Sequence, residues 1–235
     1  MTVQEIMTEL QSLGNEGIKK ILLKHGVKEP FFGVKIEHLK PIQKRIRTNY
    51  QLAKDLYATG NADAMYLAGL IADDKAMTKA DLQTWVEQAT SENISGYTVP
   101  WVTAGNDLGF ELATQWINSL EENVAYAGWS TLNNWVALKE DSELDIPALR
   151  ALLERVVKTI NTEKNKVKKA MNGFIIALGS YVLPLSGEAI AAASKIGQVT
   201  VDMGDTACKL PAANDYIMKV KNKGSLGKKK KMVNC

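Results

Sequence analysis

Helical periodicity is the feature that most limits how this chain can fold. In the stretch LQSLGNEGIKKILLKHG, apolar side chains such as Leu13, Ile18 and Leu22 recur at intervals of three to five residues. Similar spacing continues through most of the 235 residues. β-Branched residues never alternate with polar ones over a length that would indicate a strand. The pattern therefore predicts an all-α fold.

Glycine, asparagine and threonine mark where the helices begin and end. Gly14 and Asn15 separate two short helices, Gly26 ends the second, and Asn61 and Thr78 are good N-caps. After the first two short helices, we expect helices near 35–47, 49–59, 61–73, 78–90, 106–119, 122–139, 145–161, 164–182, 185–199 and 209–222.

The later helices fall into pairs joined by short turns, with first helices near residues 61, 106, 145 and 185. An interval of about 40 residues is typical of HEAT and armadillo repeats. One helical hairpin cannot bury both of its apolar faces, whereas stacked hairpins share them. We therefore expect an α-α superhelix, a solenoid of helical hairpins, in a single domain over residues 1–222. An irregular helical bundle is the alternative.

Composition restricts the kinds of site that the chain can hold. Two cysteines and two histidines are too few for a disulfide framework or a metal cluster, and no apolar run approaches the length of a membrane span. The first residues lack the apolar centre of a signal peptide. We expect a cytoplasmic protein with reduced cysteines, without a metal, a cofactor or a membrane partner.

Positive charge is concentrated at the C-terminus. The segment 219–235 has seven lysines and no acid, whereas in the whole chain the other 22 basic residues are outnumbered by 26 acidic ones. A polyanion must therefore meet a local basic face or this end of the chain. We expect residues 223–235 to form a flexible, lysine-rich tail. It either solubilises the protein or adds nonspecific affinity for nucleic acid.

The stretch YTVPWVTAGND, residues 97–107, combines aromatic residues with an acid. Tyr97 and Trp101 are four residues apart and share a face if the segment is helical. They form either a stacking wall for a nucleotide or an apolar plug between hairpins. Asp107 is either an acid at a helix N-terminus or a catalytic carboxylate.

Two further groups of residues have both a structural and a nucleic-acid-binding interpretation. Asn133, between Trp129 and Trp135, either bonds locally or donates hydrogen bonds to phosphates. The basic residues are either solvated helix faces or contacts to a DNA backbone. They are Lys164, Lys166, Lys168 and Lys169 in one helix, and Arg45 in another.

Three stretches of the chain resemble the DNA alkylation repair proteins, the AlkD-like alkylpurine-DNA glycosylases built from HEAT-like repeats. They are GVKEPFFGVKIEHLKPIQKRI, KNKVKKAMNGFIIALGSYV and VDMGDTACKLPAANDYIMKVKNKGSLGKKKKMVNC. The resemblance implies a concave, basic face that holds double-stranded DNA. It also implies a monomer that acts without a cofactor and joins the nucleoid when bound to DNA.

The family's site has an aspartate and two tryptophans near the deoxyribose of the damaged nucleotide, and an arginine on the backbone phosphate. By this resemblance Tyr97 stands where the family has tryptophan, and Trp101 where it has the aspartate. Trp129 is kept but no arginine follows it, and the late tryptophan falls near Gly173 or Phe174. Asp107 is the candidate replacement for the missing carboxylate.

The resemblance implies a DNA-binding protein that excises N-alkylated purines by hydrolysing the N-glycosidic bond. In that interpretation the lesion is faced by Tyr97, Trp101, Trp129 and Asn133, and the DNA backbone is held by Lys164, Lys166, Lys168, Lys169 and Arg45. The alternatives are a non-catalytic duplex or DNA-junction binder on the same scaffold, and a protein–protein interaction scaffold.

Overall fold

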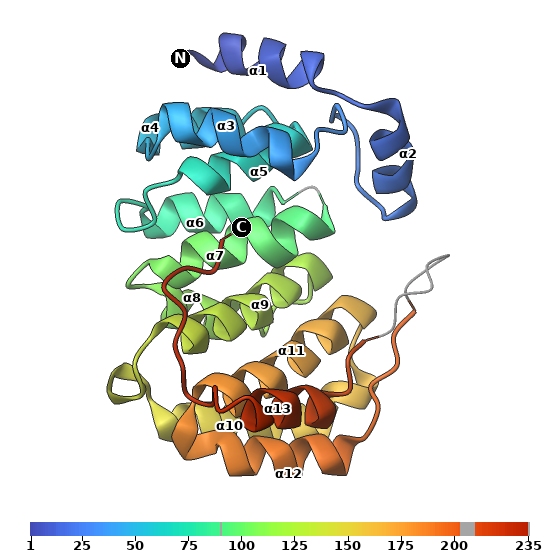
Figure 1. Ribbon diagram of the computed structural model, residues 1–235, viewed down its shortest axis with the longest axis vertical. Helices are drawn as coiled ribbons and strands as arrows, with labels where there is room; N and C mark the ends of the chain where they lie inside the picture. The colour runs from blue at the N-terminus through green and yellow to red at the C-terminus, as the bar shows by residue number, and fades with distance from the viewer. Residues whose placement is uncertain (90, 203–209, 235) are drawn as a thin grey trace. The chain divides into compact units, whose positions relative to one another are not determined.

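The computed structural model describes residues 1–89, 91–202 and 210–234, and every regular element in these ranges is a helix (Figure 1). Both cysteines lie outside the described residues. The α-helices are α1 (Val3–Ser12), α2 (Glu16–Lys24), α3 (Ile36–Ile46), α4 (Tyr50–Tyr57), α5 (Ala62–Ile71), α6 (Lys79–Glu87), α7 (Val99–Gly105), α8 (Gly109–Trp116), α9 (Glu122–Leu138), α10 (Ile146–Thr159), α11 (Asn165–Tyr181), α12 (Ser186–Ile196) and α13 (Ala213–Asn222).

Short helices of other types connect some of these elements. A π-helix, η1 (Ile94–Thr98), runs directly into α7, and the 3-10 helices are η2 (Asp141–Glu143), η3 (Ile160–Thr162) and η4 (Leu183–Leu185). The predicted helix starts at Asn61 and Thr78 are confirmed. The Asn61 side chain accepts hydrogen bonds from the amides of Asp63 and Ala64, and the Thr78 hydroxyl accepts one from Asp81.

The chain divides into two compact units. Unit 1 is Met1–Leu108 together with Asn234, and unit 2 is Gly109–Val233. In unit 1, α5 is the central helix: all ten of its residues are buried, and it contacts α1, α3, α4, η1 and α7. A helix that is apolar on every side is suited to such a position, because neighbours cover it all round.

In unit 2, α9 and α11 pack along each other and form the centre of the core. α8 covers α9, while α12 and α13 pack on α11. Gly173 of α11 allows the close approach of α9, because a Cβ atom there would lie 2.7 Å from the Asn133 amide nitrogen. Helix packing thus accounts for this mid-helix glycine.

The expected pairing of helices was shifted along the chain. Residues 94–105, where no helix was expected, are helical as η1 and α7. In unit 2 the hairpin of α11 and α12 starts at Asn165, so the helix near residue 185 is the second member of its pair and not the first. The hairpin expected from the helices near 106–119 and 122–139 is confirmed as α8 and α9, whereas the helix near residue 185 was assigned the wrong partner.

The end of the chain is packed rather than free. The Gly227 amide donates to the Ser180 carbonyl (2.9 Å), and the Lys230 amide donates to the Ala137 carbonyl (2.7 Å). The Lys229 ammonium lies 2.8 Å from the Asp141 carboxylate, and its side chain is only 8% exposed. Residues 227–230 of the segment expected to be flexible are therefore held against α9, η2 and α11 of unit 2.

Candidate nucleic-acid interface

Tyr97 and Trp101 do not form a shared wall. The Val99 amide donates to the Ile94 carbonyl, which closes a π-helical turn directly before Trp101. Tyr97 is 47% exposed, whereas Trp101 is 5% exposed.

Trp101 packs inside unit 1. Its ring meets Tyr66 edge to face, with centroids 5.2 Å apart. Gly69 makes room for it, since a Cβ there would lie 2.9 Å from the Trp101 indole nitrogen. The prediction that Trp101 faces a nucleotide therefore does not fit its position, and of the pair only Tyr97 is accessible.

Asp107 lies at the surface, at the end of α7 farther from Tyr97. Its side chain is 81% exposed, and its carboxylate pairs with the Lys75 ammonium at 2.6 Å. The helix between Tyr97 and Asp107 spans about 12 Å. A carboxylate that stabilises a developing cation acts best in a water-excluded site. Asp107 is not in such a site, and the neighbouring buried Asn106 instead holds the preceding loop by donating to the carbonyls of Asp74 and Met77.

Trp129 is also an internal residue, which corrects the expectation that it faces a lesion. It is fully buried in the core of unit 2, 5.3 Å from the ring of Phe174. The Arg155 guanidinium lies over the Trp129 ring, 5.6 Å from the ring centroid. It also donates a hydrogen bond to the Ile117 carbonyl. This arginine therefore supports the core.

Asn133 bonds locally, in agreement with the structural alternative. Its amide nitrogen donates to the Ala170 carbonyl of α11 at 3.2 Å. The side chain is half-buried and lies against Gly173. It therefore joins α9 to α11 and is not displayed to a phosphate.

The four lysines of α11 gather at its start, as predicted. The Lys164 ammonium donates to the Leu120 carbonyl, and the Lys166 ammonium to the Asn123 side chain, both at 2.8 Å. Lys164 therefore braces the turn before α9, and Lys166 braces the first turn of α9. Lys168 and Lys169 are half-buried one turn further along.

Arg45 is already paired with an acid. Its guanidinium pairs with the Glu9 carboxylate and so connects α3 to α1 within unit 1. Any contact with DNA would have to compete with this pair.

Two of the C-terminal lysines have defined contacts. We define the C-terminal basic segment as residues 219–231. Lys229 points inward to Asp141, and the Lys230 ammonium lies 5.5 Å from the ring centroid of Tyr181. The exposed lysines of the segment are 219, 221, 223, 228, 230 and 231. The run of lysines predicts a basic surface. The ion pair of Lys229 with Asp141 could not be predicted from local sequence.

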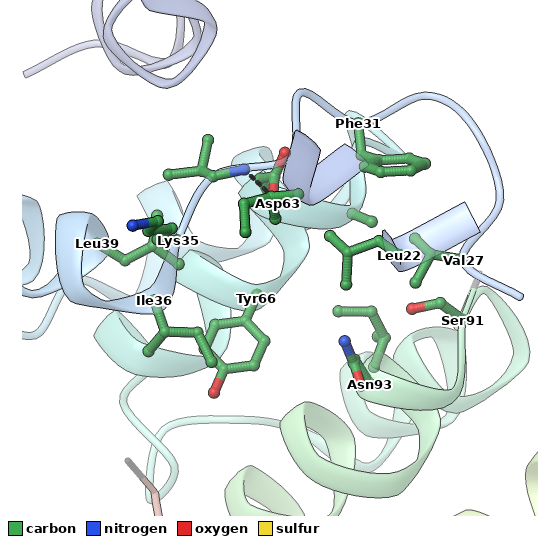
Figure 2. A pocket seen from close by; sticks show the side chains of 14 residues that line it. Leu22, Val27, Phe31, Lys35, Ile36, Leu39, Asp63, Tyr66, Ser91 and Asn93 are labelled. Carbon is green, nitrogen blue, oxygen red and sulfur yellow. Dashed lines mark hydrogen bonds between the residues drawn. The ribbon is translucent and has the colours of Figure 1, made fainter. Parts of the chain in front are cut away.

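A cavity in unit 1 was not anticipated (Figure 2). It measures about 280 Å³ and lies between α2, the loop before α3, α5 and the start of η1. In its wall, the Asp63 carboxylate accepts hydrogen bonds from the amides of Phe32, Gly33 and Val34 at 2.6, 3.0 and 3.1 Å. Burial raises the pKa of Asp63, although these three amides oppose the rise. The contacts fix the loop that forms one side of the cavity.

The described part of the chain has neither a cluster of metal-binding side chains nor a single helix suited to cross a membrane. Within it, no group of three or more histidine, cysteine, aspartate or glutamate residues is placed to hold a metal ion. No single helix there is both long and apolar enough to cross a membrane, and only α11 with the η4–α12 segment, bent by 113°, passes that criterion as a pair.

The model of the DNA alkylation repair enzyme family matches residues 6–204. Protein Lin0241 of Listeria innocua and protein Lmo0209 of Listeria monocytogenes are each 32% identical over 229 residues, covering 95% of this chain and 99% of theirs. The chain belongs to the DNA alkylation repair enzyme family.

One solved structure matches all of this chain, and is matched over all of its own, with a TM-score of 0.92 and 36% identity. That protein is described as one of a new family related to the HEAT-like repeat DNA glycosylases, with affinity for branched DNA structures. The likeness confirms the predicted HEAT-like class of fold and excludes the irregular bundle.

Proposed function

We propose that this protein binds branched DNA and does not excise alkylated bases. The observation that carries the proposal is the position of the acid. Trp101 stands where the family resemblance requires a carboxylate, and it is buried against Tyr66. Asp107, the candidate replacement, is exposed and paired with Lys75. Neither arrangement supplies the desolvated negative charge that would stabilise an oxocarbenium-like sugar.

The similarity to a protein with affinity for branched DNA supports the binding half of the proposal. At 36% identity over the full length of both chains, the likeness extends beyond general architecture. Affinity for branches needs no catalytic groups, since it depends on cations and surfaces that match the geometry of the sugar–phosphate backbone.

Two basic regions of unit 2 are the candidate backbone contacts. The first is the start of α11 with Lys164, Lys166, Lys168 and Lys169. The second is the C-terminal basic segment, whose outward lysines are held in place by the buried Lys229. Ordered cations lose little conformational freedom on binding, and each phosphate neutralised releases counterions. We therefore expect strongly salt-dependent binding.

The test measures binding and base release in the same buffer. A labelled four-way junction is titrated with the protein, and an alkylated duplex is incubated with an excess of protein while released bases are quantified. The expected result is saturable junction binding without release above the rate in protein-free controls. Release of N-alkylated purines would show that the protein is a glycosylase, and absence of any DNA binding at low salt would favour a protein–protein scaffold.

A further inference from the structure

The cavity in unit 1 is shaped for one small, largely apolar group. Its walls are mainly the side chains of Leu22, Val27, Ile36, Leu39 and Ile94. At about 30 Å³ per molecule, 280 Å³ holds about nine water molecules. This is the scale of one heteroaromatic ring system and is too small for a whole nucleotide. Apolar walls suit the faces of such a ring.

One polar group in the cavity lacks a partner among the residues that the structure describes. Ser91 is only 3% exposed, and its hydroxyl makes no hydrogen bond with any described residue. Its carbonyl accepts from the amides of Ile94 and Ser95, so the residue begins the helix without using its side chain as a cap. A buried hydroxyl without a partner is unfavourable, which points to a ligand that completes it. Asn93, exposed at the edge of the cavity beside Ser91, offers a second donor and acceptor (Figure 2).

The mouth of the cavity favours an anion. Ile36, the first residue of α3, lines it, and Lys35 precedes that helix without a side-chain hydrogen bond to the first-turn amides. An uncapped helix N-terminus attracts phosphate. The Lys35 ammonium lies 3.4 Å from the Glu37 carboxylate, but both side chains are largely exposed and such pairs open at little cost. The lysine is thus able to turn toward a phosphate.

We propose that this cavity binds the base of an unpaired nucleotide, with the phosphate of that nucleotide at the N-terminus of α3. The inference rests on the proposed function for the source of the base, because branched DNA contains unstacked bases that are extruded at low cost. A free nucleotide has the same chemistry. Ser91 and Asn93 bind the edge of the base, the apolar walls contact its faces, and Lys35 contacts the phosphate.

Two pocket variants and one control separate ligand binding from folding. Ser91→Ala removes only the unpaired hydroxyl. Leu22→Phe fills the cavity from a half-exposed position. Ser180→Ala is the matched control, because the Ser180 hydroxyl is likewise buried without a partner but belongs to unit 2. Neither serine substitution is expected to lower the melting temperature, since each removes an unsatisfied buried group.

The probe is a four-way junction with one unpaired 2-aminopurine at the crossing, compared with the fully paired junction. The wild type should prefer the unpaired junction and change the fluorescence of the analogue, which reports on its stacking. Ser91→Ala should reduce the preference about five- to ten-fold, the effect of one lost hydrogen bond. Leu22→Phe should abolish it, and Ser180→Ala should keep it.

The outcomes distinguish failure of this inference from failure of the proposed function. If the wild type binds both junctions equally and leaves the fluorescence unchanged, the cavity is not a base site, although branched-DNA binding stands. If no junction binds, titration with deoxyadenosine monophosphate tests whether the cavity binds a free nucleotide. Binding that Ser91→Ala weakens and Ser180→Ala does not would support a free-nucleotide site, and absence of binding would overturn the inference.

Discussion

Two carboxylates, the buried Asp63 and the partly buried Asp81, organise unit 1. Asp63 is 6% exposed and gathers the amides of three successive residues of the loop before α3. Asp81 is the acceptor of the capping box with Thr78, and it also binds the Lys54 ammonium (2.7 Å) and the Tyr50 hydroxyl (2.6 Å). Each acid therefore joins segments that are distant in the sequence.

Asp63→Asn should loosen the wall of the cavity. One carboxylate oxygen accepts from Phe32 and Gly33 and the other from Val34, whereas asparagine would present an NH₂ group to one of these donors. We expect a loss of about 1–3 kcal/mol in the free energy of unfolding. Hydrogen exchange of these three amides should accelerate more than that of α9. Unchanged protection would show that the loop is held by its apolar contacts alone.

The pKa of Asp81 gives a prediction about pH. Partial burial would raise this pKa, but hydrogen bonds from Lys54, Tyr50 and Thr78 outweigh burial and hold it well below its usual value. A depressed carboxylate pKa stabilises the fold fully above the unfolded-state pKa of about 4, and this contribution decreases as the pH falls below that value.

Asp81→Asn should therefore destabilise the protein by about 1–3 kcal/mol at neutral pH, and by less near pH 3. Urea denaturation of both proteins at the two pH values measures the difference. A difference that stays constant with pH would mean that the charge of Asp81 contributes nothing and that only its shape matters.

Among the secondary-structure elements, local sequence signals were sufficient to predict most helices. They failed where a contact with a residue distant in the sequence determines the local structure. The N-caps at Asn61 and Thr78 and the break at Gly14 could be identified from sequence because caps and breaks depend on nearby residues. The π-turn of η1 could not, because it coincides with the packing of Thr98 and Trp101 against Gly69 of α5. That contact also turns Trp101 inward, so the aromatic pair expected at the site was not formed.

The C-terminal basic segment depends in the same way on a contact distant in the sequence. Lys229→Met should free it, because the substitution removes the ion pair with Asp141 and the hydrogen bond to the Val136 carbonyl. We expect faster hydrogen exchange at the Lys230 and Gly227 amides and earlier trypsin cleavage. Lys228→Met, at an exposed position, is the control with the same change of charge. Equal effects of both substitutions would show that Lys229 is not the anchor.

For the whole molecule, we expect the uneven distribution of charge to determine how DNA is bound. Replacing Lys164 and Lys168 by alanine should reduce the slope of log affinity against log salt by about one to two units. Replacing Lys228, Lys230 and Lys231 should reduce it by about two to three units. Lys195→Ala, an exposed change on α12, is the control. A slope unchanged by either set would remove that region from the interface.

The family and the helical repeat class could be inferred from the sequence, because the helix periodicity and the resemblance both extend along the chain. The positions of the candidate site residues could not. Burial of Trp129 against Phe174 and the pairing of Asp107 with Lys75 depend on how helices pack, and no local pattern records such contacts.

We infer that the protein recognises DNA branches without cleaving the glycosidic bond. The most direct test is competition at one salt concentration, in which a labelled four-way junction bound to the protein is displaced by unlabelled junction or by a duplex of the same sequence and length. The account predicts that the duplex is the weaker competitor by about ten-fold or more, a difference of about 1.4 kcal/mol. Equal competition by duplex and junction would contradict it.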